Sequence, residues 1–275
     1  MNIPEVFHTE KGTTYLKECG VALLAKTHPM LSNMQPFLES FDESLGFCEY
    51  LEDQDKLDAG EDLIKAAGQL CYLSLGSART FNKDAQKYFK NILQSGHLSV
   101  VEHVSVTFLF YGISRSNTHE LVRHRLSSFS QCSQRYVGGS TLRFVERPEF
   151  QNHPKLHKMF EHRIDRLASE YEEQADILMD EQANNQLSGT EARKAVRQSA
   201  RACLPNETEA PIIVTTNLRS WRHFLDLRAT PHAEPEIRAL AVKVGQKLQA
   251  HYPNVFGDYE QYEHNGSACL KGIYK

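Results

Sequence analysis

The chain has 275 residues, of which 40% are hydrophobic and 24% charged, with only 15 Gly and 10 Pro. These proportions indicate a globular protein with a full hydrophobic core and exclude collagen-like, low-complexity and wholly disordered chains. The formal net charge of −4 argues against a general nucleic-acid coat protein or a polybasic membrane binder. However, 15 of the 16 Arg lie between Arg115 and Arg238, which indicates a small anionic ligand.

The cysteines and the N-terminal segment indicate a soluble, unexported protein of the cytoplasm. Six Cys are scattered along the chain without a C-x-x-C pair, which is typical of reduced thiols. The first residues, MNIPEVFHTEKGTTYLKECG, have neither a basic nor an apolar signal region. No apolar run reaches the roughly 18 residues that a membrane span needs.

The first half of the chain predicts both helices and strands. Residues 39–62 carry ten acidic residues and one Lys, which predicts a solvated loop and helix start, with an acidic docking surface as the alternative. We expect helices over 63–73 and over 84–95, the second capped by Asp84 and ended by Gly96. Residues 104–111 alternate between polar and apolar at first and are rich in β-branched and aromatic side chains, which predicts a strand. A short helix capped by Ser116 or Asn117 and ending near His124, and a strand over 141–145, should follow.

The second half is mostly helical. Between residues 153 and 184, apolar residues recur at spacings of three and four, which predicts one long amphipathic helix. The stripe consists of Leu156, Phe160, Ile164, Leu167, Tyr171, Ala175 and Leu178. Further helices are expected over 190–203, 218–227 and 234–251, with a strand over 211–216. The absence of strict βαβ alternation predicts an α+β fold. No G-x-G-x-x-G or G-x-x-x-x-G-K-[ST] motif is present, so side chains and irregular backbone must bind any phosphate.

The segment from Arg123 to Tyr136 is the most informative one. It reads RHRLSSFSQCSQRY and contains three Arg, one His, four Ser and two Gln. Such donors suit a polyanion and the edge of a flat heterocycle. On composition alone two other interpretations stay open: an exposed basic loop without a ligand, and a single-stranded nucleic-acid contact that uses Phe129 and Tyr136 for stacking.

Besides the R-H-R of the segment above, the chain contains GHLSVVEH at 96–103, RACLP at 201–205 and NLRSWRHFLDLRATPH at 217–232. These four ordered motifs are similar to those of the flavin-dependent thymidylate synthases, the ThyX family. The R-H-R of residues 123–125 followed by Ser133 resembles the family signature. GHLSVVEH at 96–103 resembles the histidine-containing flavin segment, and RACLP at 201–205 resembles an Arg-x-x-Leu-Pro element. NLRSWRHFLDLRATPH at 217–232 resembles the C-terminal block. The resemblance covers roughly residues 70–250.

The resemblance implies an α+β fold with mixed helices around a small antiparallel sheet. It further implies reductive methylation of dUMP to dTMP, with 5,10-methylenetetrahydrofolate as carbon donor and FAD, reduced by NADPH, as hydride source. The implied partners are dUMP, the folate and the nicotinamide nucleotide, and no nucleic acid or membrane is expected to bind. The implied assembly is a homotetramer whose sites are shared between subunits. We expect a single catalytic domain over 63–255, an acidic N-terminal extension over 1–62 and a C-terminal tail over 256–275.

The resemblance assigns the dUMP contacts to two stretches and two further arginines. These residues are Glu120, Leu121, Val122, Arg123, Gln131, Cys132, Ser133, Gln134, Arg135, Arg201 and Arg228. Arg228 is the candidate catalytic residue, because its permanently charged guanidinium can hold negative charge on uracil ionised at N3. Without the resemblance, an ion pair of Arg228 at a helix end, for instance with Glu234, is the simpler interpretation.

The resemblance assigns FAD contacts to His97, Ser99, Arg123, His124, Arg125, Gln131, Asn217, Leu218, Arg219 and His223. Arg219 and His223 lie four residues apart and should share one helix face. Gln131 stands where many members have Glu, and His223 where some have Asn.

Several residues suggest other chemistry. Ser133 has no His placed in the sequence to activate it, and reduced flavin removes the need for an enzyme nucleophile. Cys132 is expected to point away into packing. His97, His103, His119 and His124 lack the spacing of a zinc helix, so no metal site is expected. Two functions of other classes stay open: a metal-dependent nucleotide hydrolase or deaminase that uses this His cluster, and an Arg-rich single-strand binder.

Overall fold

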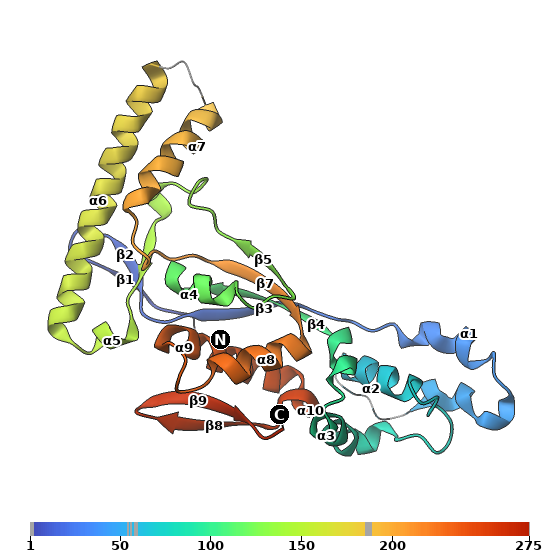
Figure 1. Ribbon diagram of the computed structural model, residues 1–275. Coiled ribbons are helices and arrows are strands. Elements are labelled where there is room, and N and C mark those ends of the chain that lie inside the picture. Colours follow the sequence, from blue (N-terminus) through green and yellow to red (C-terminus); the bar gives the residue numbers. More distant parts are fainter. Residues whose placement is uncertain (1–2, 54, 56, 58–59, 185–188, 275) are drawn as a thin grey trace.

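The structure is a computed structural model, which describes residues 3–53, 55, 57, 60–184 and 189–274. At its centre is a four-stranded antiparallel sheet with the order β3-β4-β7-β5 (Figure 1). Its strands are β3 (Gly20–Lys26), β4 (Ser105–Tyr111), β5 (Ser127–Gln131) and β7 (Ile212–Asn217). The sheet therefore joins segments that lie far apart in the sequence.

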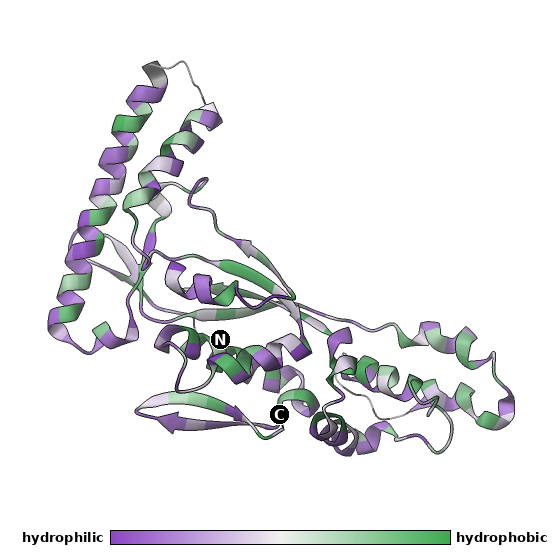
Figure 2. Cartoon of the chain, in the orientation of Figure 1, coloured by the Kyte–Doolittle hydropathy of each residue, from purple (hydrophilic) through white to green (hydrophobic). Residues whose placement is uncertain are grey.

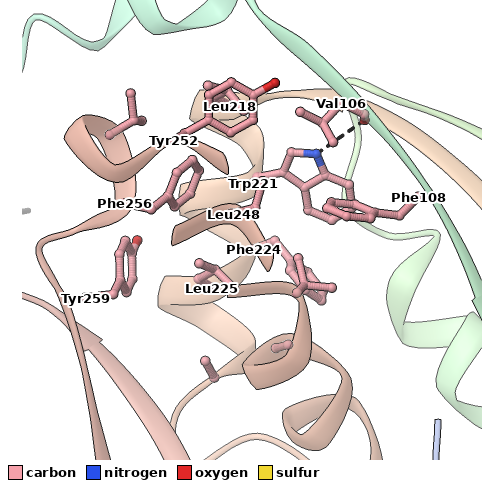
Figure 3. Packing of buried hydrophobic residues seen from close by; sticks show 14 of the residues in the cluster. Val106, Phe108, Leu218, Trp221, Phe224, Leu225, Leu248, Tyr252, Phe256 and Tyr259 are labelled. Carbon is pink, nitrogen blue, oxygen red and sulfur yellow. Dashed lines mark hydrogen bonds between the residues drawn. The ribbon is translucent and has the colours of Figure 1, made fainter. Parts of the chain in front are cut away.

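One face of the sheet carries the main hydrophobic core. In β4 the alternate side chains Val106, Phe108 and Phe110 are buried, as the alternating pattern predicted. They pack against Trp221 and its neighbours on α8, and the Trp221 indole donates a hydrogen bond to the Val106 carbonyl (3.4 Å; Figure 3). On the other face Ile213 is 37% exposed, so that face is only partly covered within the described chain.

Helices α4, α8 and α9 contribute side chains to this core. They span Arg115–Leu121, Leu218–Arg228 and Pro235–His251. Ser114 caps α4 through a hydrogen bond from the Asn117 amide, in place of the predicted Ser116 or Asn117. Asn217 caps α8 by accepting from the Ser220 amide (2.8 Å). These caps fix the starts of the two helices that flank the RHR signature in space.

A helical arm projects from one side of the sheet (Figure 1). It consists of α5 (Pro148–Gln151), α6 (Pro154–Asn184) and α7 (Gly189–Ala200), followed by a short 3-10 turn over Arg201–Cys203. The predicted apolar stripe of α6 is confirmed, because all seven residues are buried or half-buried. Figure 2 shows the matching alternation of hydrophilic and hydrophobic residues along α6.

The base of the arm packs on a small second sheet. Its strands are β1 (Val6–His8), β2 (Thr14–Leu16) and β6 (Arg143–Val145). Phe160 and Ile164 of α6 form a cluster with Tyr15 and Phe144 of this sheet. The strand predicted at 141–145 is therefore present, while β1 and β2 were not predicted.

A helical lobe lies at the opposite side of the molecule from the arm (Figure 1). It contains α1 (Gln35–Leu38), α2 (Glu61–Leu70), α3 (Ala85–Ser95) and several 3-10 turns. These turns span Leu31–Met34, Glu43–Leu45, Phe47–Glu52, Asn82–Asp84 and Leu98–His103. Gly96 ends α3 in the left-handed conformation, as predicted, whereas Asp84 forms no side-chain cap. Within the acidic segment, Gln54, Lys56, Asp58 and Ala59 lie outside the described residues.

The C-terminal residues form a hairpin that was not predicted. The short helix α10 (Pro253–Phe256) leads into β8 (Tyr259–His264) and β9 (Ser267–Gly272). Tyr259 and Leu270 belong to the main core, and β3 of the N-terminal segment pairs with β4. Both flanking segments thus contact the central unit, and the division at residues 62 and 255 stays a prediction. Over the described ranges, no helix combines the length and apolar character of a membrane span.

Candidate active site

A cavity of about 780 Å³ lies beside α8 and the turn that follows α4. Six of the residues that the sequence assigned to ligands line it together: Arg123, His124, Arg125, Arg219, His223 and Arg228. Arg219 and His223 lie one turn apart on α8, as their spacing predicted. With Arg222, five arginines line this cavity, and such a set of guanidinium groups suits phosphate or carboxylate ligands.

Arg228 is held by two side chains from the segment that precedes β5. Its Nη1 donates a hydrogen bond to the Glu120 carboxylate, and its Nε donates to His124 Nε2 (3.1 Å). The side chain of Arg228 is 22% exposed and that of Glu120 is 32% exposed. The alternative partner, Glu234, pairs with Arg147 and caps α9 instead. Arg228 therefore does form an ion pair at the end of α8, but its partner is Glu120 and not Glu234, and the residue also lines the cavity.

His124 is held in its neutral form. Burial, the Arg228 guanidinium and His223 lower the pKa of His124 from 6.5 to about 4. Since Nε2 accepts from Arg228, the proton of the neutral ring belongs on Nδ1. The ring also packs edge-on against Phe224, with centroids 5.1 Å apart. At neutral pH His124 is thus an oriented polar group, and an approaching anion would raise its proton affinity.

Two further features belong to the lining of the cavity, an exposed ion pair and a residue with a strained backbone. Arg219 pairs with Glu102 at 2.5 Å, and both side chains are nearly half exposed, so solvent weakens this pair. Leu126, at the turn into β5, has a φ of +58° and is 83% exposed. A branched residue in the left-handed region is strained, and such strain concentrates at functional sites. Both features lie on the cavity lining.

The stretch from Gln131 to Arg135 lies apart from this first cavity. Gln131 Nε2 donates to Thr118 Oγ1 (3.2 Å), which links β5 to α4. Cys132 and Gln134 line a second cavity of about 390 Å³, which shares no lining residue with the first. Cys132 is exposed, so the expectation that it points into packing is wrong. Partial burial and Glu209 raise the pKa of its thiol, which disfavours a thiolate nucleophile.

The second cavity lies beside polar groups that lack partners. Gln134 Nε2 and Arg135 Nε are buried and have no hydrogen-bond partner among the described residues. Unpaired buried donors are costly, and they are commonly completed by a ligand, an ion or water. Both atoms are donors, which fits an anionic ligand such as a phosphate. Ser133 Oγ accepts from the Arg135 amide (3.4 Å) and so fixes the start of this loop.

The structure places the other predicted residues outside both cavities. Leu121 and Leu218 are buried in the core, so only their backbone can serve a ligand. Asn217 uses its side-chain oxygen to cap α8. The remaining residues are His97 and Ser99, which are exposed, Val122, which is 40% exposed, and Arg201, which is half-buried. Glu120, Gln131, Ser133 and Arg135, whose contacts are given above, line neither cavity either.

Several lining residues were not singled out from the sequence. They are Leu93, Leu98, Glu102, Leu126, Ser220, Arg222, Asp226, Leu227 and Tyr274. Those on α8 follow the same helix face as Arg219 and His223, so the helical period was a usable signal. Glu102 lies inside the GHLSVVEH motif. No sequence signal pointed to Tyr274.

The donor set suits a dinucleotide or nucleotide phosphate better than a metal. The lining of the first cavity is rich in arginine, and a guanidinium has no lone pair to offer a metal ion. In the part of the chain that the structure describes, no group of three His, Cys, Asp or Glu residues is arranged to hold a metal ion. A flavin dinucleotide carries a pyrophosphate, and the arginines and His223 suit that charge.

Comparisons with known proteins agree with this geometry. The family model for the thymidylate synthase complementing proteins, Thy1, matches residues 54–254. A flavin-dependent thymidylate synthase of Mycolicibacterium gilvum is 43% identical over 203 residues, which cover 74% of this chain and 81% of that protein. A protein of the same name from Corynebacterium glutamicum is 39% identical over 204 residues, with the same coverage of both chains.

A solved structure shares the fold. It is the UMP/dUMP methylase PolB from Streptomyces cacaoi bound with 5-Br dUMP, with a TM-score of 0.61. The likeness covers 88% of this chain and 95% of that chain at 19% identity. The α+β architecture predicted from the sequence is therefore confirmed, and the fold and the arginine-lined cavity define a class of α+β proteins with a site suited to anionic ligands. Within that class, the chain belongs to the Thy1 family of flavin-dependent thymidylate synthases.

Proposed function

We propose that this protein is a flavin-dependent thymidylate synthase, which methylates C5 of dUMP to form dTMP. The observation that carries the proposal is the convergence of Arg123, His124, Arg219, His223 and Arg228 on one cavity. Each of these residues belongs to a motif of the family, and three anionic ligands require such a cationic site. The substrate, the folate and the flavin all carry negative charge at neutral pH.

We assign the first cavity to FAD and to the uracil end of dUMP. Arg123, Arg219 and His223 would hold the pyrophosphate, while Glu102 would release Arg219 when the phosphate enters. That exchange requires little free energy, because the Arg219–Glu102 pair is exposed. When bound, reduced FAD supplies the hydride, 5,10-methylenetetrahydrofolate supplies the carbon, and NADPH restores the reduced flavin.

The role of this chain's own residues is to orient the ligands and to hold charge. Arg228 cannot lose its proton near neutral pH, so it can stabilise negative charge on the uracil ring and raise the electron density at C5. Glu120 and neutral His124 fix the direction of its guanidinium. With this arrangement already present, little reorganisation accompanies the reaction.

We propose that the dUMP phosphate is held by the loop at the second cavity, from another subunit. Gln134 lines that cavity and, like its neighbour Arg135, has a buried donor without a partner among the described residues, whereas Arg228, which binds Glu120, lines the first cavity. In support, the expected dUMP residues of one chain are divided between two cavities that share no lining residue, with Arg123 and Arg228 at the first and Cys132 and Gln134 at the second. A homotetramer with sites shared between subunits would bring them together, and the partly exposed Ile213 leaves room on the sheet face for such contacts.

The test is the flavin content of the purified protein. Wild-type protein should bind FAD without a covalent bond and form dTMP from dUMP in the presence of the folate and NADPH. Arg123→Ala together with His124→Ala should produce colourless protein, since both side chains line the cavity.

A matched control is His162→Ala together with Arg166→Ala, an exposed pair on α6. This control should keep its full flavin absorbance. Full flavin occupancy in the double variant of the cavity would contradict the assignment of the site.

A further inference from the structure

The chain's C-terminal hairpin leads to the flavin cavity. After β9 ends at Gly272, the next two residues lie beside α8, and Tyr274 lines the first cavity. Figure 1 shows this end of the chain next to α10 and α3. Leu93 at the end of α3 and Leu98 in the following turn line the cavity as well. The cavity therefore has an apolar wall in addition to its cationic residues.

Tyr274 is anchored by a buried ion pair. Arg222 and Asp258 form two hydrogen bonds of 2.6 and 2.8 Å, and their side chains are only 4% and 3% exposed. Arg222 Nη2 donates to the Tyr274 carbonyl (3.1 Å), and the Tyr274 amide donates to Asp258 Oδ2 (3.3 Å). The Ile273 amide donates to the Asp258 carbonyl (3.0 Å).

These contacts hold the backbone of Tyr274 from both sides. A residue whose backbone is fixed in this way has already lost its backbone freedom, so only side-chain entropy remains to be lost when its ring contacts a ligand. An unattached chain end would lose much more. The backbone of Tyr274 is therefore preorganised for a contact between its ring and a ligand.

An aromatic side chain and two leucines that line the same cavity suit a flat ring, because ring stacking combines apolar burial with favourable geometry. The arginines and His223 of the same cavity suit a pyrophosphate. A dinucleotide combines both chemistries in one molecule, with a ring system at each end.

We propose that Tyr274 is a ligand-contacting residue of this cavity, whose ring packs against a flat heteroaromatic ring of FAD. The proposal rests on the proposed function for the identity of the ligand. It assigns a binding role to the C-terminal hairpin, which the motifs of the sequence do not cover.

The test is the affinity of the flavin-free protein for FAD, measured by titration. Tyr274→Ala and Tyr274→Leu should each weaken FAD binding by about 5- to 100-fold, the range expected for loss of one stacked ring. Tyr274→Phe should stay within about threefold of wild type, since the ring remains. The matched control is Ile273→Ala, because Ile273 is 55% exposed, precedes Tyr274 and does not line the cavity. It should bind FAD as wild type does.

Two outcomes would overturn the proposal: wild-type affinity in Tyr274→Ala, or equal affinities of Tyr274→Leu and Tyr274→Phe. The Leu variant separates stacking from simple filling of space, so a general loss of folding cannot imitate the expected pattern. Failure of the wild-type protein to bind FAD would instead contradict the proposed function. Titrations with ADP and with FMN identify the ring: a loss confined to ADP supports adenine, and a loss confined to FMN supports the isoalloxazine. Unchanged binding of both probes would contradict stacking.

Discussion

Two arginines on one helix show how differently the same side chain is used. Arg222 and Arg228 both belong to α8 and both line the first cavity. Arg222 is 4% exposed, and its guanidinium binds Asp258 and the carbonyl groups of Val255 and Tyr274. Arg228 is 22% exposed and binds Glu120 and His124.

The partners explain the difference. Asp258 is buried and bound to backbone groups of the C-terminal segment, so the ion pair of Arg222 joins α8 to the hairpin. Glu120 is about one-third exposed, and a ligand can take its place. A buried and fully bonded arginine therefore serves the fold, whereas an arginine with exchangeable partners is available for chemistry.

The largest expected effect is the loss of stability on substitution of the buried Arg222. Arg222→Met should lower the free energy of unfolding by about 3–5 kcal/mol, because it leaves the Asp258 carboxylate buried without its partner. Denaturant unfolding measures the change. Arg219→Met is the control, since its ion pair with Glu102 is exposed and should contribute less than about 1 kcal/mol. Equal effects of the two substitutions would show that the burial of Arg222 does not matter.

The second largest expected effect is the loss of turnover on substitution of Arg228, the last residue of α8. Arg228→Lys keeps the charge but loses the planar guanidinium that binds two partners, which should raise the barrier by about 2–4 kcal/mol. The variant should keep its FAD and lose roughly 30- to 1000-fold in dTMP formation. The measurements are the flavin content, the affinity for dUMP and the methylation rate. Unchanged turnover, or flavin lost in step with activity, would contradict the role of Arg228.

The smallest expected effect is the pH dependence of the free energy of unfolding that His124, the partner of Arg228, produces. Folding lowers the pKa of His124 to about 4, so between about pH 6.5 and pH 4 the unfolded chain binds the extra proton. This contribution to stability is therefore present above pH 6.5 and is lost as the pH falls through that window. Between pH 7 and pH 4.5, wild type should lose about 1–2 kcal/mol more than His124→Asn, after allowance for solvent screening. Unfolding curves at the two pH values measure it, and parallel losses would show that His124 is not held neutral.

Local patterns in the sequence predicted most of the regular elements. The alternation of β4 and the stripe of α6 both depend on residues within four positions of each other, so short windows contain the information. The motifs likewise identified Arg123, His124, Arg219, His223 and Arg228 as ligand-binding residues, and in the structure these residues line one cavity. Their spacing on α8 set which of them share a face.

The missed elements lack such local signals. In β5 the polar sequence Ser-Ser-Phe-Ser-Gln forms an edge strand because β7 provides its hydrogen-bonding partner. In the C-terminal hairpin, β8 is mostly polar and exposed, and it is held by β9 and by the core contact of Tyr259. Pairing with a distant strand can override a weak local pattern.

The sequence by itself determined the family, the α+β class and the cationic character of the site, because these depend on residue types and short spacings. Only the tertiary structure decided which partners the site residues have. Arg228 meets His124 across 104 positions and Glu120 across 108, and Tyr274 reaches the cavity through the Arg222–Asp258 pair. Such contacts arise when the whole core closes, since packing of the sheet against α8 and α9 brings distant segments within hydrogen-bond distance.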